Sequence, residues 1–140
     1  MPVTEDQRRE LLQAAAQAAA KAYAPYSRFR VGAAVLGKRL HVGANIENAA
    51  YSATLCAERV ALSSALLDDD RDLLALAIAT PDKLSSQEPG ESLPCGTCRQ
   101  WLAELAPGIE VVIALDGPIY TLADLLPHHF RLNSNCRSDD

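Results

Sequence analysis

Two short cysteine-containing runs constrain this chain more than any other feature of its sequence. Cys56 opens a Cys-Ala-Glu-Arg run, and Cys95 and Cys98 form a C-x-x-C between a proline and an arginine. Both runs stand at the predicted start of a helix, so a fold that points the two helix N-termini at one spot gathers three thiolates around one cation. Three protein ligands leave a zinc ion one open position, which is the layout of a catalytic site rather than a closed structural one.

Each cysteine motif also has a simpler interpretation. A lone C-x-x-C can be two small buried residues at a turn, or a redox dithiol, and a helix N-terminus favours the thiolate in either chemistry. The separate Cys56 shifts the balance toward metal. A fourth ligand would close the site and make the chain a non-catalytic zinc-stabilised domain, but Cys136 lies in a tail without packing signals. None of the histidines stands at a helix start: His41, His128 and His129.

Two charged residues follow Cys56 at informative spacings. Glu58 is two positions along the predicted helix, a rotation of about 200° away from Cys56. It is therefore expected beside the metal as a proton shuttle rather than on the ligand face, although most helix glutamates are simple surface residues. Arg59, three positions after Cys56, shares the face of that cysteine and can donate to its sulfur. A solvated arginine fits the same spacing equally well.

Composition narrows the class of protein. The 140 residues, nearly half of them hydrophobic, suit a single domain over residues 1–140, with about 131–140 as a tail. No apolar run approaches the ~20 residues of a membrane span, and no signal peptide is visible, so we expect a cytoplasmic protein with reduced thiols. The net charge of −5 argues against a nucleic-acid partner.

The predicted elements alternate between helices and strands. Pro25 is expected to end the first helix, and Gly37-Lys38 suits a two-residue hairpin turn. Helices alternating with buried strands predict a three-layer α/β/α domain with a mixed sheet. The helices are expected over about 4–23, 56–67, 97–106 and 121–126, and the strands over about 29–36, 39–43, 73–80 and 110–115.

Longer runs resemble the small, homotetrameric nucleoside cytidine deaminases over nearly the whole chain. The metal motifs are shared by the wider deaminase superfamily, in which a Glu that is not a ligand accompanies the cysteines. The run Asn-Ile-Glu-Asn-Ala followed by Tyr-Ser is far more specific to the nucleoside enzymes. The runs that carry the resemblance are 24–34, 43–52, 56–59, 94–100 and 125–127.

The resemblance implies a cytidine-deaminase-like fold with a five-stranded sheet and a zinc-dependent hydrolase. One zinc per chain would be held by Cys56, Cys95 and Cys98. Zinc-bound hydroxide would attack carbon 4 of cytosine, with Glu58 as proton shuttle, and ammonia would leave. The substrates would be cytidine and 2′-deoxycytidine, giving uridine and deoxyuridine in pyrimidine salvage.

The resemblance also implies the substrate contacts. Asn45 and Glu47 resemble the pair that holds the ribose hydroxyls, and their i, i+2 spacing puts both on one side of an extended segment. Asn is also a common turn residue. Phe29 resembles the aromatic beside the base, and Tyr51 belongs to the substrate-binding set. Phe130 resembles an aromatic that reaches the base from a neighbouring chain in a homotetramer with shared active sites.

Two departures from the family pattern stand out. The hairpin before Asn45 is cut to Gly37-Lys38, and the polar loop 81–93 could alter substrate access. A related deaminase acting on another aminated pyrimidine is the nearest rival, against which Asn45 and Glu47 argue. Editing of cytosine in RNA or DNA is disfavoured by the charge and by the lack of an aromatic and basic groove.

Overall fold

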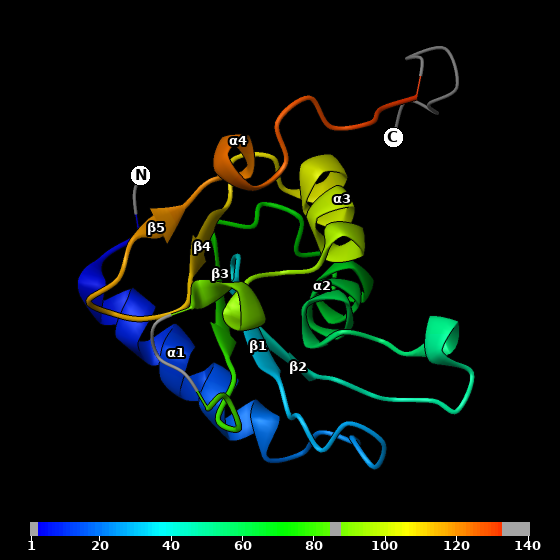
Figure 1. Ribbon diagram of the computed structural model, residues 1–140. Helices are drawn as coiled ribbons and strands as arrows, with labels where there is room; N and C mark the ends of the chain where they lie inside the picture. The colour runs from blue at the N-terminus through cyan, green and yellow to red at the C-terminus, as the bar shows by residue number, and fades with distance from the viewer. Residues whose placement is uncertain (1–2, 85–87, 133–140) are drawn as a thin grey trace.

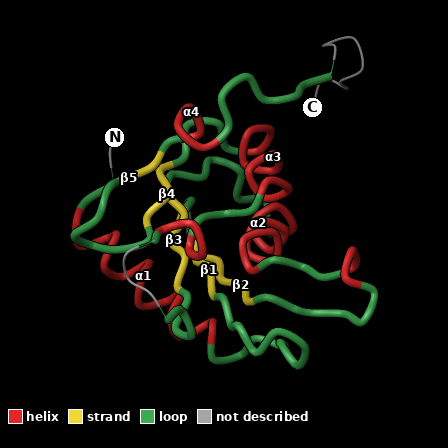
Figure 2. Tube along the Cα trace, viewed as in Figure 1, coloured by secondary structure: helices red, strands yellow, loops and turns green. Residues whose placement is uncertain are grey.

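The structure is a computed structural model that describes residues 3–84 and 88–132. A five-stranded sheet lies at its centre, between α1 on one side and α2 and α3 on the other (Figure 1). Figure 2 shows the long loops that join these elements. The helices are α1 (Glu5–Ala19), α2 (Ala57–Leu67), α3 (Gly96–Leu105) and α4 (Leu122–Leu125), and the strands are β1 (Gly32–Leu36), β2 (Leu40–Ala44), β3 (Ala75–Ala79), β4 (Glu110–Val112) and β5 (Ile119–Tyr120).

The sheet is mixed, in the order β2-β1-β3-β4-β5. Strand β1 pairs antiparallel with β2 and with β3, and β4 pairs antiparallel with β5. Strands β3 and β4 run parallel, and α3 makes the crossover between them. The predicted fold class, α/β/α with a mixed five-stranded sheet, is confirmed.

Successive residues of β1 pack against opposite layers. Ala33 and Val35 join the core formed with α2 and α3, whereas Ala34 joins the smaller core beneath α1. This alternation is the period of two that a strand imposes on its side chains. The larger of the two cores lies directly behind the N-terminus of α2, so packing fixes where Cys56 stands.

The ends of several elements differ from the sequence prediction. Helix α1 has the predicted capping box, in which Thr4 and Gln7 bond reciprocally, but it ends at Ala19 and not near Tyr23. The reason is that the backbone N–H of Tyr23 donates to Asn45 O, 2.9 Å away, which pulls this residue into an extended conformation. Strand β5 is absent from the predicted element list because its two residues are too few to show a period.

The predicted two-residue hairpin turn between β1 and β2 is wrong. Leu36 pairs with Leu40, which leaves three residues in the turn, and none of the glycines among the described residues has a positive φ. Gly37 serves a different purpose, because a Cβ there would collide with the carboxylate of Asp70. That carboxylate accepts from the backbone N–H groups of Lys38 and Arg39, each at 2.9 Å.

Among the described residues, every helix is too short or too polar to cross a membrane. The assignment of the whole chain to one domain stays a prediction. The predicted tail and Cys136 fall largely on residues 133–140, which lie outside the described residues.

Candidate metal centre and active site

Three cysteine sulfur atoms meet at the N-termini of α2 and α3. The Sγ atoms of Cys56, Cys95 and Cys98 all lie within 4.8 Å of one another, and those of Cys56 and Cys95 are 3.5 Å apart. Cys98 is buried, Cys56 is half-buried and Cys95 is exposed, so the group opens to solvent on one side. The convergence of two helix starts that the sequence predicts is therefore present.

Cys56 and Cys95 are the N-cap residues of their helices. Both have extended backbone angles, and neither side chain accepts a capping hydrogen bond from a backbone N–H group of its own helix. An N-cap side chain normally satisfies one of the free N–H groups at a helix start. The two sulfur atoms are turned toward one another instead.

The sulfur geometry fits a zinc ion. Tetrahedral zinc with Zn–S bonds of about 2.3 Å places its sulfur ligands about 3.8 Å apart, close to the separation of Cys56 and Cys95. Thiolates are a preferred donor type for zinc. Among the described residues, this is the one group of three or more His, Cys, Asp or Glu side chains close enough to share an ion.

Arg59 supports Cys56 from the same face of α2, as its spacing suggests. Its Nη2 atom donates to Cys56 Sγ at 3.4 Å and to the carbonyl of Thr54 at 3.3 Å. Hydrogen bonds from the Cys98 thiol and from Arg59 lower the pKa of Cys56, against the opposing effect of burial. The guanidinium therefore favours the thiolate form that a metal ligand needs.

Glu58 is buried beside the sulfur atoms and is not a member of their cluster. It lines a cavity of about 160 Å³ together with Cys56, Cys95 and Asn45. Burial raises the pKa of its carboxyl group to about 7, and the charge of Cys56 acts in the same direction. A carboxyl group in this position can exchange protons with a molecule held in the cavity.

A second cavity adjoins the first at Thr54, which lines both. It measures about 440 Å³, and its other lining residues include Tyr26, Ser27, Glu47 and Tyr51. Glu47 accepts from the backbone N–H groups of Tyr26 and Ser27 at 3.0 and 3.1 Å and from the Ser27 hydroxyl group. The Ser27 hydroxyl bond, ahead of the backbone bonds, lowers the pKa of Glu47. Glu47 is therefore held as an ionised acceptor.

Asn45 holds the backbone of the segment that contains Phe29. Its Oδ1 atom accepts from the Val31 N–H at 2.9 Å, and its Nδ2 atom donates to the Phe29 carbonyl at 2.8 Å. A primary amide has two acceptor and two donor positions, so one of each stays available to a ligand. Asn45 thus faces the cavity of Glu58 while fixing the half-buried Phe29.

The remaining two predicted aromatics are exposed. Tyr51 lies edge-on to Tyr26, with ring centroids 6.4 Å apart, and is 78% exposed. Phe130 is 66% exposed and lines neither of the two cavities. In a single chain the three cysteines, Glu58 and Asn45 lie together, and Glu47 and Tyr51 line the adjoining cavity. The predicted Phe29 and Phe130 line neither cavity.

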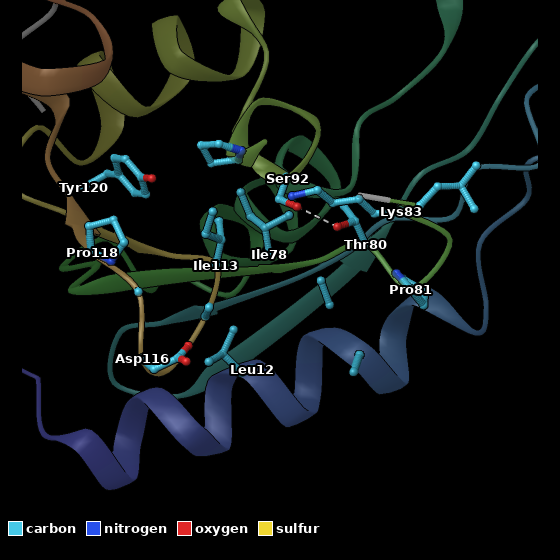
Figure 3. Close-up of a pocket in the computed structure, with 16 residues that line it drawn as sticks. Leu12, Ile78, Thr80, Pro81, Lys83, Ser92, Ile113, Asp116, Pro118 and Tyr120 are labelled. Atoms are coloured by element: carbon cyan, nitrogen blue, oxygen red, sulfur yellow. Dashed lines mark hydrogen bonds between the residues drawn. The ribbon is translucent and has the colours of Figure 1, made fainter. Parts of the chain in front are cut away.

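A larger pocket lies elsewhere, between α1 and the ends of β3 and β4. Figure 3 shows it, with the hydroxyl groups of Thr80 and Ser92 joined by a 2.7 Å hydrogen bond. It measures about 880 Å³ and shares Ile78 and Ser92 with the cavity of Glu58, but it contains none of the cysteines. Size alone does not mark the reactive site, which is where the titratable groups converge.

Sequence reasoning missed Ser27 and Thr54. Ser27 buttresses Glu47, and Thr54 forms the wall between the two cavities and accepts from Arg59. Both are small polar residues in irregular segments, where no periodic pattern distinguishes a site residue from a turn residue. The spatial return of 24–28 to Glu47 reveals Ser27, and the lining that the two cavities share reveals Thr54.

The chain is similar in sequence to proteins named as deaminases. Residues 5–115 match the family model described as cytidine and deoxycytidylate deaminase zinc-binding region. A relative from Halalkalibacterium halodurans named cytidine deaminase is 46% identical over 129 residues, covering 88% of this chain and 93% of that one. A cytidine deaminase from Mycobacterium tuberculosis is 43% identical, covering 85% of this chain and 86% of that one.

Solved structures agree with the sequence relatives. The crystal structure of cytidine deaminase from Burkholderia pseudomallei superimposes with a TM-score of 0.76 at 40% identity, over 87% of this chain and 98% of that one. That of the Mycobacterium tuberculosis enzyme gives a TM-score of 0.70 at 42% identity, over 89% of this chain and 97% of that one.

Proposed function

Because the family model spans most of its length, the chain belongs to the cytidine and deoxycytidylate deaminase family, and from that premise we propose that it hydrolyses free cytidine and 2′-deoxycytidine to uridine and deoxyuridine in pyrimidine salvage. The observation that carries the proposal is the cavity in which Cys56, Cys95 and the buried Glu58 face one another. The aminated base would enter that cavity, and its sugar would occupy the larger one beyond Thr54.

Cys56, Cys95 and Cys98 would hold the zinc, which when bound supplies a Lewis acid that makes water a nucleophile near neutral pH. Arg59 offsets the negative charge of three thiolates by donating to Cys56. The net reaction adds the water oxygen to carbon 4 of the base and breaks the bond from that carbon to the amino nitrogen. Ammonia leaves.

Glu58 would be the proton carrier in that reaction. Its carboxylate would take one proton from water and deliver it to the ring nitrogen, and would then take the second proton from the hydroxyl group added at carbon 4 and pass it to the departing amino group. The burial of Glu58 keeps bulk water from competing for these protons. Its separation from the sulfur cluster leaves it free of the metal.

The sugar and base contacts follow from the same arrangement. Glu47, fixed by Ser27, would accept from a ribose hydroxyl group, and the unused donor and acceptor of Asn45 would complete that contact. Phe29 would lie beside the base, because Asn45 pins its backbone next to the cavity. Tyr51 would close the sugar side.

We also propose a homotetramer in which neighbouring chains complete each site. Phe130 is exposed and lines neither cavity of its own chain, so its ring is available to contact the base bound to a neighbouring subunit. A cytoplasmic location suits the three reduced thiols that the metal needs.

The test is cytidine turnover, followed by the fall in cytidine absorbance, together with the zinc content of the same samples. Wild type should carry about one zinc per chain and convert cytidine, and strong chelation should abolish the conversion. Glu58→Gln should retain the zinc and lose activity by ~10²–10⁴-fold or more, because one residue serves several proton transfers. Turnover by Glu58→Gln within tenfold of wild type would refute the assigned role. A fully active monomer in light scattering would refute shared sites.

A further inference from the structure

Two neighbouring side chains of α3, Arg99 and Gln100, bind the segment 125–130 to the start of α3, where Cys95 and Cys98 lie. Arg99 Nε donates to the Pro94 carbonyl and Arg99 Nη1 to the Leu125 carbonyl, each at 2.7 Å. Gln100 Nε2 donates to the Phe130 carbonyl at 2.9 Å. Figure 1 shows α4 next to α3, with the C-terminal segment continuing from α4.

The carbonyl groups that Arg99 reaches have few other sources of a donor. Pro94 is fully buried and comes directly before Cys95, at the start of α3. Leu125 is buried at the end of α4, where the last carbonyl groups of a helix lack intrahelical partners. Charged donors make the stronger hydrogen bonds, and an acceptor left buried without one is destabilising. Arg99 therefore fixes both segments relative to α3.

From these contacts we propose that Arg99 and Gln100 are positioning residues for two parts of the active site, the backbone beside the zinc ligand Cys95 and the segment that carries Phe130. Arg99 sets the backbone beside Cys95 and ties it to α4, and Gln100 sets the backbone of Phe130. The inference rests on the proposed function, in which Cys95 binds zinc and Phe130 contacts the base in a neighbouring subunit. Loss of the Arg99 side chain should then weaken both zinc retention and substrate affinity. Loss of the Gln100 side chain should weaken substrate affinity alone.

The alternative is that the pair only stabilises the fold. Arg8 offers a matched control, since it is a half-buried arginine with two hydrogen bonds, to Glu110 Oε2 at 3.2 and 3.0 Å. Arg8 belongs to α1, on the opposite face of the sheet from α3. A purely structural role predicts that Arg8→Met and Arg99→Met lower the melting temperature and leave zinc release and KM alone.

The experiment compares wild type with Arg99→Met, Arg99→Lys, Gln100→Ala and Arg8→Met. Zinc release into excess chromogenic chelator is measured at neutral pH, with KM and kcat for cytidine on the zinc-loaded proteins. Arg99→Met should release zinc at least about tenfold faster, the factor that ~1.4 kcal/mol represents, and should raise KM. Arg99→Lys should fall between, because an ammonium lacks the fork that spans two carbonyls. Gln100→Ala should raise KM about threefold or more while releasing zinc within about twofold of wild type.

Zinc release by Arg99→Met at the wild-type rate overturns the inference, as does equal acceleration by Arg8→Met. If Arg99→Met does not fold, wild-type zinc release and KM in Arg99→Lys overturn it. An unchanged KM in Gln100→Ala removes the role of Gln100. Failure of the proposed function is distinguishable, because a wild-type protein that binds zinc without converting cytidine would disprove the activity while the release rates still report on Arg99.

Discussion

Replacing Asp70 with Asn should weaken the hairpin that holds β1 and β2 in register. Asp70 is completely buried, and its carboxylate accepts from the backbone N–H groups of Lys38 and Arg39. His41 Nε2 lies 2.9 Å from the same group. An Asn amide keeps one oxygen and places an NH2 where the second oxygen stood, so a donor then faces a donor.

The size of the effect follows from the pKa of Asp70. Burial alone would raise it, but the bonds from Lys38, Arg39 and His41 outweigh burial and lower the pKa to about 2. Because the folded-state pKa lies below the unfolded value near 4, the ionised group stabilises the fold above about pH 4, and this contribution is lost as the pH falls through about 2. The difference corresponds to about 2 kcal/mol at neutral pH.

Urea unfolding at fixed protein concentration, at pH 7 and at pH 2.5, tests this value. The control is Asp69→Asn, the same change at an exposed neighbour with φ 55, a conformation that Asn tolerates. Asp70→Asn should lose about 2 kcal/mol at pH 7, Asp69→Asn almost nothing, and the gap between wild type and Asp70→Asn should shrink toward pH 2.5. Equal unfolding midpoints for the two variants at pH 7, or a gap that is independent of pH, would refute the reasoning.

Three further variants test other parts of the chain. Gly43→Ala would place a Cβ 2.5 Å from the backbone of α2, so the helix must shift. We expect the free energy of unfolding in urea to fall by ~1–3 kcal/mol and zinc release to become faster. Unchanged values of both would contradict the tight packing. Ser27→Ala removes the hydroxyl group that fixes Glu47; KM for cytidine should rise about tenfold with little change in melting temperature, and an unchanged KM would count against the sugar site. Cys95→Ala should lose zinc and part of its stability together, because ligation energy is folding energy; full zinc by metal analysis would exclude Cys95 as a ligand.

The sequence predicts those parts of the fold that depend on local pattern. Thr4 and Gln7 predict the start of α1, and the two cysteine runs predict the starts of α2 and α3. These starts can be predicted because a helix cap depends on residues that are adjacent in the sequence. The convergence of the two cysteine runs also follows from the sequence, because three cysteines that bind one zinc ion must bring their sulfur atoms together.

Features that depend on distant partners escape the sequence. The three-residue turn after Leu36 is set by Asp70, which lies more than thirty positions away, and no local signal links them. The double role of Asn45, which fixes Phe29 and still faces the cavity, appears only when 29–31 lies beside it. Ser27 becomes visible as a site residue for the same reason.

The use of cysteines as N-caps gives the metal a second task. A helix that begins with a sulfur turned away from its own N–H groups forgoes a cap that is typically worth ~1 kcal/mol, and α2 and α3 both begin in this way. A cation bound between the two sulfur atoms would be the common anchor of two otherwise frayed ends. Removal of the metal should therefore open the N-terminal turns of α2 and α3 first. Amide hydrogen exchange should become faster in these turns while the amides of the central strands stay protected. Loss of the metal would therefore disorder the first turns of α2 and α3 in the folded protein, in addition to lowering the stability of the whole chain.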